Sequence, residues 1–153
     1  MNERRVLRVY ADTSVFGGCF DVEFARPSKE FFARVREGLF RLVVSETTLL
    51  ELRKAPEKVQ RVLSTLPPDG VEEIEGAETM EKLREAYLAA GVLDENSRQD
   101  AEHVAWATVA EVDFVVSWNF KHLVHYEKIS GFQGVNLIHG HKAIQIYSPL
   151  EVI

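Results

Sequence analysis

Three short and almost uninterrupted apolar runs place the tightest limit on the fold of this 153-residue chain. They span residues 6–11, 39–44 and 114–117. A strand with one face in water alternates apolar and polar residues, whereas a strand of a parallel sheet is apolar throughout because helices cover both of its faces. The runs are therefore predicted to be adjacent parallel strands of one sheet.

Helical patterns fill the segments between these runs. Alternation of strands and helices implies right-handed crossovers and a sheet covered on both faces. The predicted fold is α/β, a three-layer α/β/α sandwich with a mostly parallel sheet of about five strands, in a single domain over residues 1–153. We expect a loop over 17–27, then helices over 28–38 (with Ser28 as N-cap), 49–66 (broken near Pro56), 77–90 and 100–111, and weaker strands at 71–74, 135–138 and 144–147.

The composition is that of an ordinary globular protein, with 46% hydrophobic and 27% charged residues. No apolar run reaches the roughly 20 residues of a membrane helix, and the N-terminus lacks the apolar segment of a signal peptide. The single cysteine, Cys19, suits a reducing compartment. A cytoplasmic protein without a membrane partner is therefore expected.

Four polar residues lie where a predicted strand ends or a helix begins: Asp12, Glu51, Asp100 and Asn119. The carboxyl ends of parallel strands converge on one crevice. Three carboxylates and an amide there would form an oxygen-rich site of the kind that Mg²⁺ or Mn²⁺ prefers. We expect the carboxyl groups to cluster, and their pKa values to be mutually raised when no metal is bound.

Each of these residues also has a purely structural interpretation. Asp12 could be a helix N-cap, and Asn119 could close a turn. Thr48 and Glu51 have the spacing of a capping box, in which the glutamate bonds to the N-cap amide. Asp100 could simply complement the dipole of the helix that it opens.

Taken together and in order, the motifs resemble those of the PIN domain family of nucleases, over nearly the whole chain. The residues that carry the resemblance are Asp12-Thr13-Ser14-Val15, Glu51, Asp100 with His103-Val104-Ala105, Ser117-Trp118-Asn119, and the tail Pro149-Leu150-Glu151-Val152-Ile153.

The resemblance implies a sheet of about five parallel strands, one or two Mg²⁺ or Mn²⁺ ions, and cleavage of phosphodiester bonds, most often in RNA. Asp12, Glu51 and Asp100 would be the acidic metal-site residues, and Asn119 stands where many members have a fourth acid. Many small members are VapC-type toxins of type II toxin–antitoxin pairs. The implied partners are an RNA substrate, a small antitoxin protein and a second copy of the chain.

Further residues could assist this chemistry. Ser14 and Ser117 could position a water or a phosphate oxygen, although turn-stabilising hydroxyls are the simpler interpretation. Two basic groups, Arg53 with Lys54 and Lys121 with His122, could contact substrate, although solvated helix faces explain most such residues. Because the net charge is −6, broad electrostatic attraction cannot hold RNA, and the metal is expected to assist binding.

Other functions fit less well. His139 and His141 lack cysteine partners for zinc, His103 is expected to be an interior residue, and Cys19 has no partners for nucleophilic catalysis. The segment after Asp12 lacks the second aspartate of a haloacid-dehalogenase-type phosphatase, and the paired acids and lysine of a receiver domain are missing. The alternative outside enzymology is a PIN-like domain without catalytic activity that binds RNA or protein.

Overall fold

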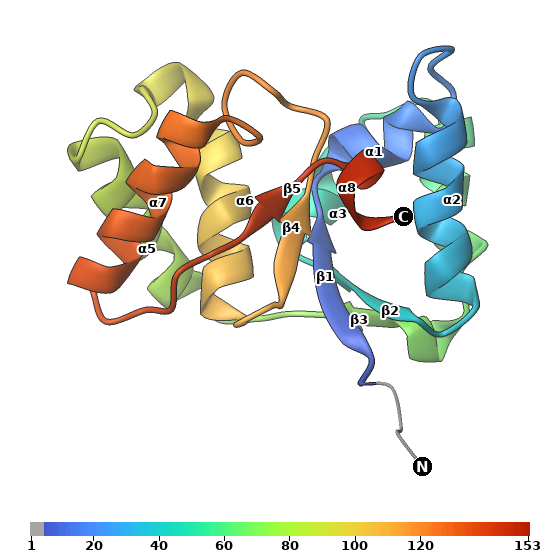
Figure 1. Cartoon of the computed structure of the whole chain (residues 1–153), viewed down its shortest axis with the longest axis horizontal. Helices are drawn as coiled ribbons and strands as arrows, with labels where there is room; N and C mark the ends of the chain where they lie inside the picture. The colour runs from blue at the N-terminus through green and yellow to red at the C-terminus, as the bar shows by residue number, and fades with distance from the viewer. Residues whose placement is uncertain (1–4) are drawn as a thin grey trace.

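The computed structural model describes residues 5–153, and residues 1–4 of the predicted single domain lie outside this range. Its centre is a five-stranded sheet in the order β3-β2-β1-β4-β5, and every pair of neighbours is parallel (Figure 1). The predicted strand arrangement is thus confirmed, with β1 between β2 and β4. The strands are β1 (Leu7–Ala11), β2 (Phe40–Val44), β3 (Val71–Glu73), β4 (Phe114–Val116) and β5 (Ile146–Tyr147).

Side chains of the central strands alternate between two hydrophobic cores. On β1, Val9 and Ala11 point to one core and Tyr10 points to the other. On β2, Val44 joins the first pair and Val43 joins Tyr10. All five side chains are fully buried, because each face of the sheet is covered by helices.

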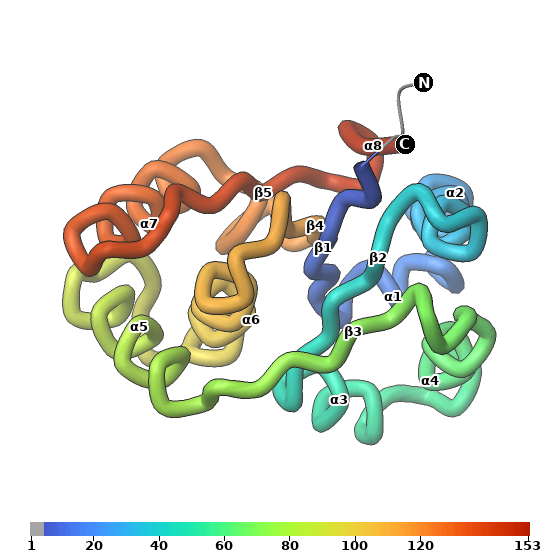
Figure 2. The backbone as a smooth tube through the Cα atoms, turned by 90° about the horizontal axis from the view of Figure 1, so that it is seen from below, coloured from blue at the N-terminus to red at the C-terminus, as the bar shows by residue number. Residues whose placement is uncertain are grey.

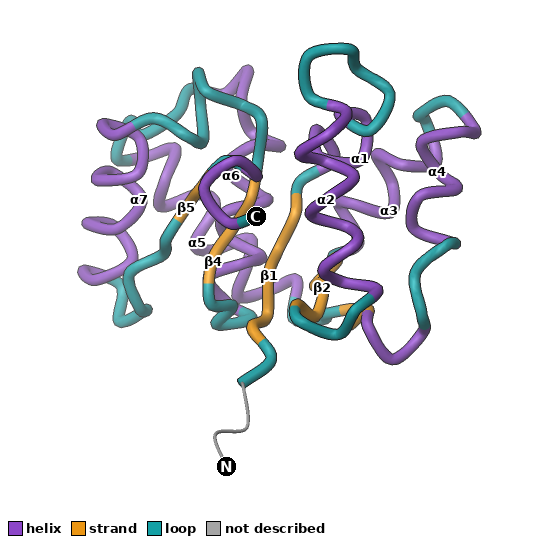
Figure 3. The backbone as a smooth tube through the Cα atoms, turned by 45° about the vertical axis from the view of Figure 1, so that its right-hand side comes forward, coloured by secondary structure: helices purple, strands orange, loops and turns teal. Residues whose placement is uncertain are grey.

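The helices form two layers, which Figure 2 shows on opposite sides of the sheet. The layer that we call the α1–α4 layer contains α1 (Thr13–Gly18), α2 (Ala25–Arg36), α3 (Glu46–Arg53), α4 (Glu57–Ser64) and the short α8 (Pro149–Val152). The α5–α7 layer contains α5 (Ala77–Ala89), α6 (Arg98–Val109) and α7 (Tyr126–Ile138). Figure 3 separates the same layers from another side.

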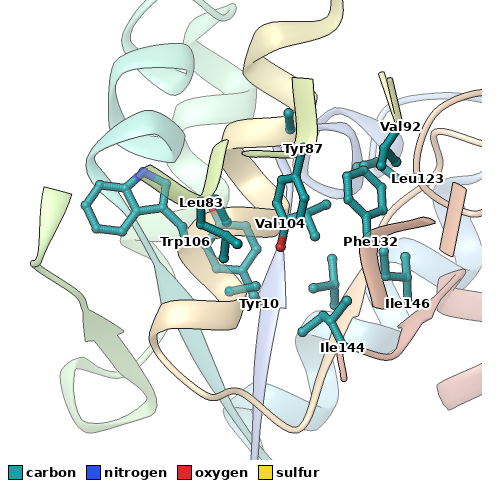
Figure 4. Close-up of a cluster of buried hydrophobic side chains, with 14 of the residues drawn as sticks. Tyr10, Leu83, Tyr87, Val92, Val104, Trp106, Leu123, Phe132, Ile144 and Ile146 are labelled. Atoms are coloured by element: carbon teal, nitrogen blue, oxygen red, sulfur yellow. The ribbon is translucent and has the colours of Figure 1, made fainter. Parts of the chain in front are cut away.

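The core of the α5–α7 layer surrounds α6, which is apolar almost all round, as its sequence predicted. Tyr10, Leu83, Tyr87 and Phe132 lie on different sides of Val104 in Figure 4. This core also contains a polar network. The Tyr87 hydroxyl donates to Asn136 Oδ1, and Asn136 Nδ2 donates to Thr108 Oγ1 at 3.0 Å.

Two predictions for residues 17–38 were wrong. Helix α2 begins at Ala25 and not at Ser28, because Phe24 stacks on Trp118 with 4.2 Å between ring centroids. Ser28 is instead buried inside the helix and accepts a hydrogen bond from Trp118 Nε1 at 2.8 Å. The segment 17–27 is also only partly a loop, since α1 extends to Gly18.

Residues 135–138 were predicted as a strand but form the end of α7. Phe132 and Val135 are both buried and lie three residues apart, which is the spacing of a helix face. Periodicity alone cannot separate helix from strand for a short apolar run, so contact with the core decides. The weak strands at 71–74 and 144–147 are present in shorter form as the edge strands β3 and β5. Within residues 5–153, no helix has both the length and the apolarity needed to span a bilayer.

Candidate active site

The candidate site lies at the carboxyl edge of the sheet, where β1 and β4 end side by side. Asp12 follows β1 directly, and its backbone N–H donates to the carbonyl of Val116, the last residue of β4, at 3.2 Å. Ser117 and Asn119 follow on the β4 side. The parallel pairing of these two strands therefore brings the Asp12 segment against the Ser117–Asn119 segment.

Asp12 is almost completely buried, with 4% of its surface exposed. It is the N-cap of α1: its Oδ1 accepts from the backbone N–H and the hydroxyl of Ser14. Its Oδ2 accepts from the Ser117 hydroxyl at 2.6 Å. Burial raises the pKa of Asp12; the charge of His103 and both serine hydroxyls oppose this rise, and the negative charge of Asp100 adds to it. A cation at this carboxylate would offset the cost of keeping it ionised.

For Ser14 and Ser117, turn-stabilising hydroxyls were the simpler interpretation, with positioning of water or phosphate as the alternative. In the structure both hydroxyls donate to Asp12 and accept from the following loop. Ser14 Oγ accepts from the N–H of Trp118 at 2.9 Å, and Ser117 Oγ accepts from the N–H of Asn119 at 2.9 Å. The two serines thus hold Asp12 and the Trp118–Asn119 turn together.

Glu51 projects from α3, and the capping-box interpretation of this residue is wrong. The N-cap of α3 is Ser45, whose side chain accepts from the N–H of Thr48. Glu51 bonds to other elements instead. Its Oε2 accepts from Thr13 Oγ1 at 2.7 Å, and its Oε1 lies 2.6 Å from His103 Nε2.

The pKa of Glu51 is lowered, whereas a raised value was predicted. Burial alone would raise it, but the hydrogen bond and charge of His103, the Thr13 hydroxyl and the charge of Lys54 together outweigh burial. Glu51 has a cationic neighbour that the prediction from like charges did not include. It is therefore an ionised acceptor.

His103 is buried on α6, as the sequence predicted, and connects Glu51 to the core. Its Nδ1 lies 2.7 Å from the hydroxyl of Tyr10, opposite the Nε2 that meets Glu51. Burial disfavours a charge on this ring, but the Tyr10 oxygen and the carboxylates of Glu51 and Asp12 favour it more. The pKa of His103 is consequently raised well above its usual range.

Asp100 opens α6 and faces the loop after β4. Its Oδ2 lies 2.9 Å from His122 Nδ1 and accepts from Asn119 Nδ2 at 3.3 Å. The Asn119 Oδ1 points the other way and accepts from the backbone N–H groups of Lys121 and His122, at 3.2 and 2.9 Å. Asn119 thus turns a donor, and not its oxygen, toward Asp100.

The four predicted residues therefore form two linked sets. Glu51 bonds to Thr13, the residue that follows Asp12 in sequence, and Asp100 bonds to Asn119. Residues 5–153 contain no group of three or more acidic, histidine or cysteine side chains arranged to hold a metal ion jointly. The donors have the oxygen chemistry that Mg²⁺ and Mn²⁺ prefer, and such an ion commonly binds one or two carboxylates and completes its shell with water and substrate phosphate. The charge of Asp100 acts on Asp12, so these two carboxylates are the candidates for this simpler requirement.

The predicted basic contacts are spread around the site. Lys54 and Lys121 are exposed, and the charge of Lys54 acts on Glu51. Arg53 lines a cavity of about 400 Å³ with Glu46 and Glu73, so acidic groups surround it. His122 already forms a hydrogen bond with Asp100. Substrate contact by these residues remains a prediction.

Sequence reasoning missed the roles of Thr13, Tyr10 and the ring of His103. Thr13 directly follows Asp12, and His103 follows Asp100 by about one helical turn, which were the available signals. Tyr10 gave no signal, because a tyrosine inside a buried strand is an ordinary core residue.

No protein-family model matches this chain, and no curated protein sequence matches it. Among solved structures, the chain is similar to one in the crystal structure of VapBC2 from Rickettsia felis bound to a DNA fragment from their promoter. The match covers 93% of this chain and 98% of that one, with a TM-score of 0.57 and 12% sequence identity. At this identity the likeness concerns the fold. Together with the all-parallel sheet between two helical layers, it shows that the chain has an α/β/α fold of the PIN-like type.

Proposed function

We propose that this protein is a metal-dependent endoribonuclease that hydrolyses phosphodiester bonds, and that it is the toxin of a type II toxin–antitoxin pair. The observation that carries the proposal is Asp12, a carboxylate with 4% exposure at the carboxyl edge of the sheet. A buried acid with a raised pKa is costly to keep unless it has a role. Its neighbours Asp100 and Glu51 provide the further acids that nuclease chemistry requires.

Asp12 and Asp100 would hold Mg²⁺ or Mn²⁺, and Glu51 would complete the acidic set. When bound, such an ion polarises a phosphoryl oxygen and lowers the pKa of water. The Asn119 side-chain N–H would keep Asp100 oriented. This role differs from the predicted one, in which Asn119 binds the metal through its amide oxygen. The number of ions, one or two, is part of what metal titration would measure.

The residues of the chain then have distinct tasks in hydrolysis. The ionised Glu51 accepts a hydrogen bond from the attacking water and orients it. The serines at Asp12 fix that carboxylate, so that no reorganisation is needed as charge develops on the phosphate. Lys54 and Lys121 supply exposed positive charge for the flanking phosphates, in a chain whose net charge is −6.

The direct test is cleavage of a mixed single-stranded RNA pool with titrated Mn²⁺, beside the same reaction in EDTA. We expect cleavage that rises with Mn²⁺ and stops in EDTA. Asp12→Asn is expected to abolish it. Asp21→Asn is the matched control, because Asp21 is an exposed aspartate that also accepts from a backbone N–H two residues on.

Cleavage that persists in EDTA would contradict the metal requirement. No cleavage with any divalent metal would instead favour the alternative, a PIN-like module that binds RNA or protein without cutting. Light scattering on the purified protein would show whether it is a homodimer.

An antitoxin partner has a suitable surface on the α1–α4 layer. A cavity of about 460 Å³ there has an apolar floor that includes Phe20, Phe32 and Val62. Its rim carries four basic residues, Lys29, Arg36, Lys58 and Arg61. An amphipathic segment with acidic residues beside its apolar face would match this surface in both charge and hydrophobicity.

Charge reversal tests this assignment. Lys58→Glu together with Arg61→Glu should weaken an acidic antitoxin segment by about 10-fold or more, measured by calorimetry with the protein encoded beside this one. Lys82→Glu together with Lys142→Glu, in exposed positions of the chain outside this surface, is the control. Equal binding by both double variants would place the partner elsewhere.

A further inference from the structure

A chain of hydrogen bonds runs from the interior of the sheet to Glu51. It begins at the Tyr10 hydroxyl, which lies 2.7 Å from Ser45 Oγ and 3.1 Å from Thr48 Oγ1. It continues from Tyr10 to His103 Nδ1 at 2.7 Å, and from His103 Nε2 to Glu51 Oε1 at 2.6 Å. Tyr10 is fully buried and His103 is 2% exposed, so water does not compete with these contacts.

The direction of the bonds follows from the chemistry of their partners. The Glu51 carboxylate can only accept, so His103 Nε2 must carry a proton. The neighbouring carboxylates favour the charged ring, in which Nδ1 also carries a proton and donates to the Tyr10 oxygen. The Tyr10 hydroxyl can then donate to Ser45 or Thr48. The orientation of the ring that serves Glu51 is thus set by groups in the core.

The bonds also close a ring through three elements. Ser45 is the N-cap of α3, the helix that carries Glu51, and it contacts Tyr10 on β1. Tyr10 contacts His103 on α6, and His103 returns to Glu51 on α3. The second oxygen of Glu51 is held by Thr13. Both carboxylate oxygens therefore have a fixed donor, and the helix and its acid are aligned by the same tyrosine.

We propose that His103 is a positioning residue for Glu51, held in the required orientation by Tyr10. This inference rests on the proposed nuclease function, in which Glu51 orients the attacking water. His103 does not reach the substrate. It acts through Glu51, in the way that outer-shell partners orient the acidic residues of metal sites.

The kinetic test compares variants that differ only in the donor at Nε2. His103→Leu removes it, and kcat should fall about 10–100-fold with little change in KM. His103→Gln restores an N–H donor near the Nε2 position and should recover a large part of the loss. Tyr10→Phe should lower kcat by a smaller factor. Tyr87→Phe is the matched control, because its hydroxyl is equally buried but bonds to Asn136 and Thr108.

A readout independent of RNA cleavage separates this inference from the proposed function. In ¹⁵N–¹H spectra of the imidazole, the wild-type His103 should show a slowly exchanging proton on Nε2. Glu51→Gln and Tyr10→Phe should each shift this signal, whereas Tyr87→Phe should not. A folded His103→Leu variant with wild-type kcat would overturn the positioning role. Failure of the wild type to cleave RNA would overturn the nuclease proposal, and the spectra alone would then decide whether His103 holds Glu51.

Discussion

The two helical layers bury similar amounts of apolar side chain but treat polar groups differently. In the α1–α4 layer, aromatic rings pack on one another: Phe31 lies 5.2 Å from Phe32 and 5.7 Å from Phe40 between ring centroids. In the α5–α7 layer, the core includes the Tyr87–Asn136–Thr108 network. In the α1–α4 layer, Ser28 accepts a buried hydrogen bond from Trp118, whereas the α5–α7 network joins three side chains.

Charge divides in the same way along the chain. Residues 1–64 contain 12 Lys and Arg and 9 Asp and Glu, whereas residues 65–153 contain 6 and 15. The net charge of −6 therefore hides a positive first part and a strongly negative second part. The candidate site lies on the boundary, since Asp12 and Glu51 come from one part and Asp100 from the other.

Precise orientation of Glu51 comes in part from the α5–α7 layer. The imidazole that bonds to Glu51 belongs to His103 on α6, a helix of the α5–α7 layer. The cavity that we propose for a partner is in the α1–α4 layer. The His103 contact to Glu51 and the proposed partner surface thus lie on different sides of one sheet.

The largest expected effect is that of Asp12→Asn, which should change activity and stability in opposite directions. Asp12→Asn should lower RNA cleavage at least about 100-fold, or about 2.7 kcal/mol. It should also raise Tm at neutral pH by about 2–4 °C for each kcal/mol recovered, because it removes a buried negative charge. Activity and calorimetric unfolding of the same samples would show both changes.

The sign of the pH dependence follows from the raised pKa of Asp12. The folded state binds this proton more tightly than the unfolded state, so Asp12 contributes stability as pH falls through its folded pKa toward 3.8. The Asn variant should lack this contribution, and its advantage over the wild type should shrink in acid. A Tm advantage that is the same at all pH values would contradict the assignment.

A second prediction tests whether solvent reaches the core of the α1–α4 layer at Cys19. Burial raises the pKa of this thiol to about 11, against the opposing charges of Lys29 and Arg36. At pH 8 the folded protein should therefore alkylate about 100-fold more slowly than the unfolded chain, whose thiol has a pKa near the model-peptide value of about 8.5–9. Mass spectrometry after timed exposure to iodoacetamide measures the rate. Comparable rates in water and in denaturant would mean that this layer admits solvent.

A third prediction compares one buried polar residue from each layer. Asn136→Ala should cost about 2–3 kcal/mol of unfolding free energy. It leaves Tyr87, Thr108 and the carbonyl of Lys142 without the hydrogen bonds that Asn136 makes to them. Ser28→Ala strands only Trp118 Nε1 and should cost about 1 kcal/mol. Urea unfolding midpoints would rank the two, and equal costs would remove the contrast between the layers.

The smallest effects concern ion pairs. Arg61 pairs with Glu57 on the surface of α4, where both side chains are more than half exposed, and Arg61→Ala should cost no more than about 0.5 kcal/mol. Arg84 pairs with Glu102 in the α5–α7 layer, with side-chain exposures of 16% and 18%. Arg84→Ala should cost about 1–2 kcal/mol. Salt titration is the check, since 1 M NaCl should erase the first difference and leave most of the second.

The sequence allowed the sheet and the candidate residues to be predicted, because both follow from local pattern. Continuous apolar runs mark strands that are buried on both faces, and polar residues at their ends mark the carboxyl edge. The start of α2 could not be predicted, since it depends on the stacking of Phe24 on Trp118, which is distant in sequence.

The same reason limits prediction of the site. Glu51 obtains its donor from His103, 52 residues away, so no local motif indicates that its pKa is lowered. The orientation of the Asn119 amide depends on two backbone N–H groups in the turn that follows it. The sequence indicated which polar residues lie near the carboxyl edge of the sheet, but their hydrogen-bond partners could be found only in the fold.

The central position of β1 has a consequence for synthesis of the protein. Asp12 leaves the ribosome before Ser117, and the hydrogen bond between them joins residues that are 105 positions apart. At 5–20 residues per second, roughly 5–20 s separate the appearance of the two groups. During this interval the nascent chain carries the acid without the strand that encloses it. A ribosome-bound fragment that ends before β4 should therefore lack the proposed nuclease activity, which should begin only after β4 has been made.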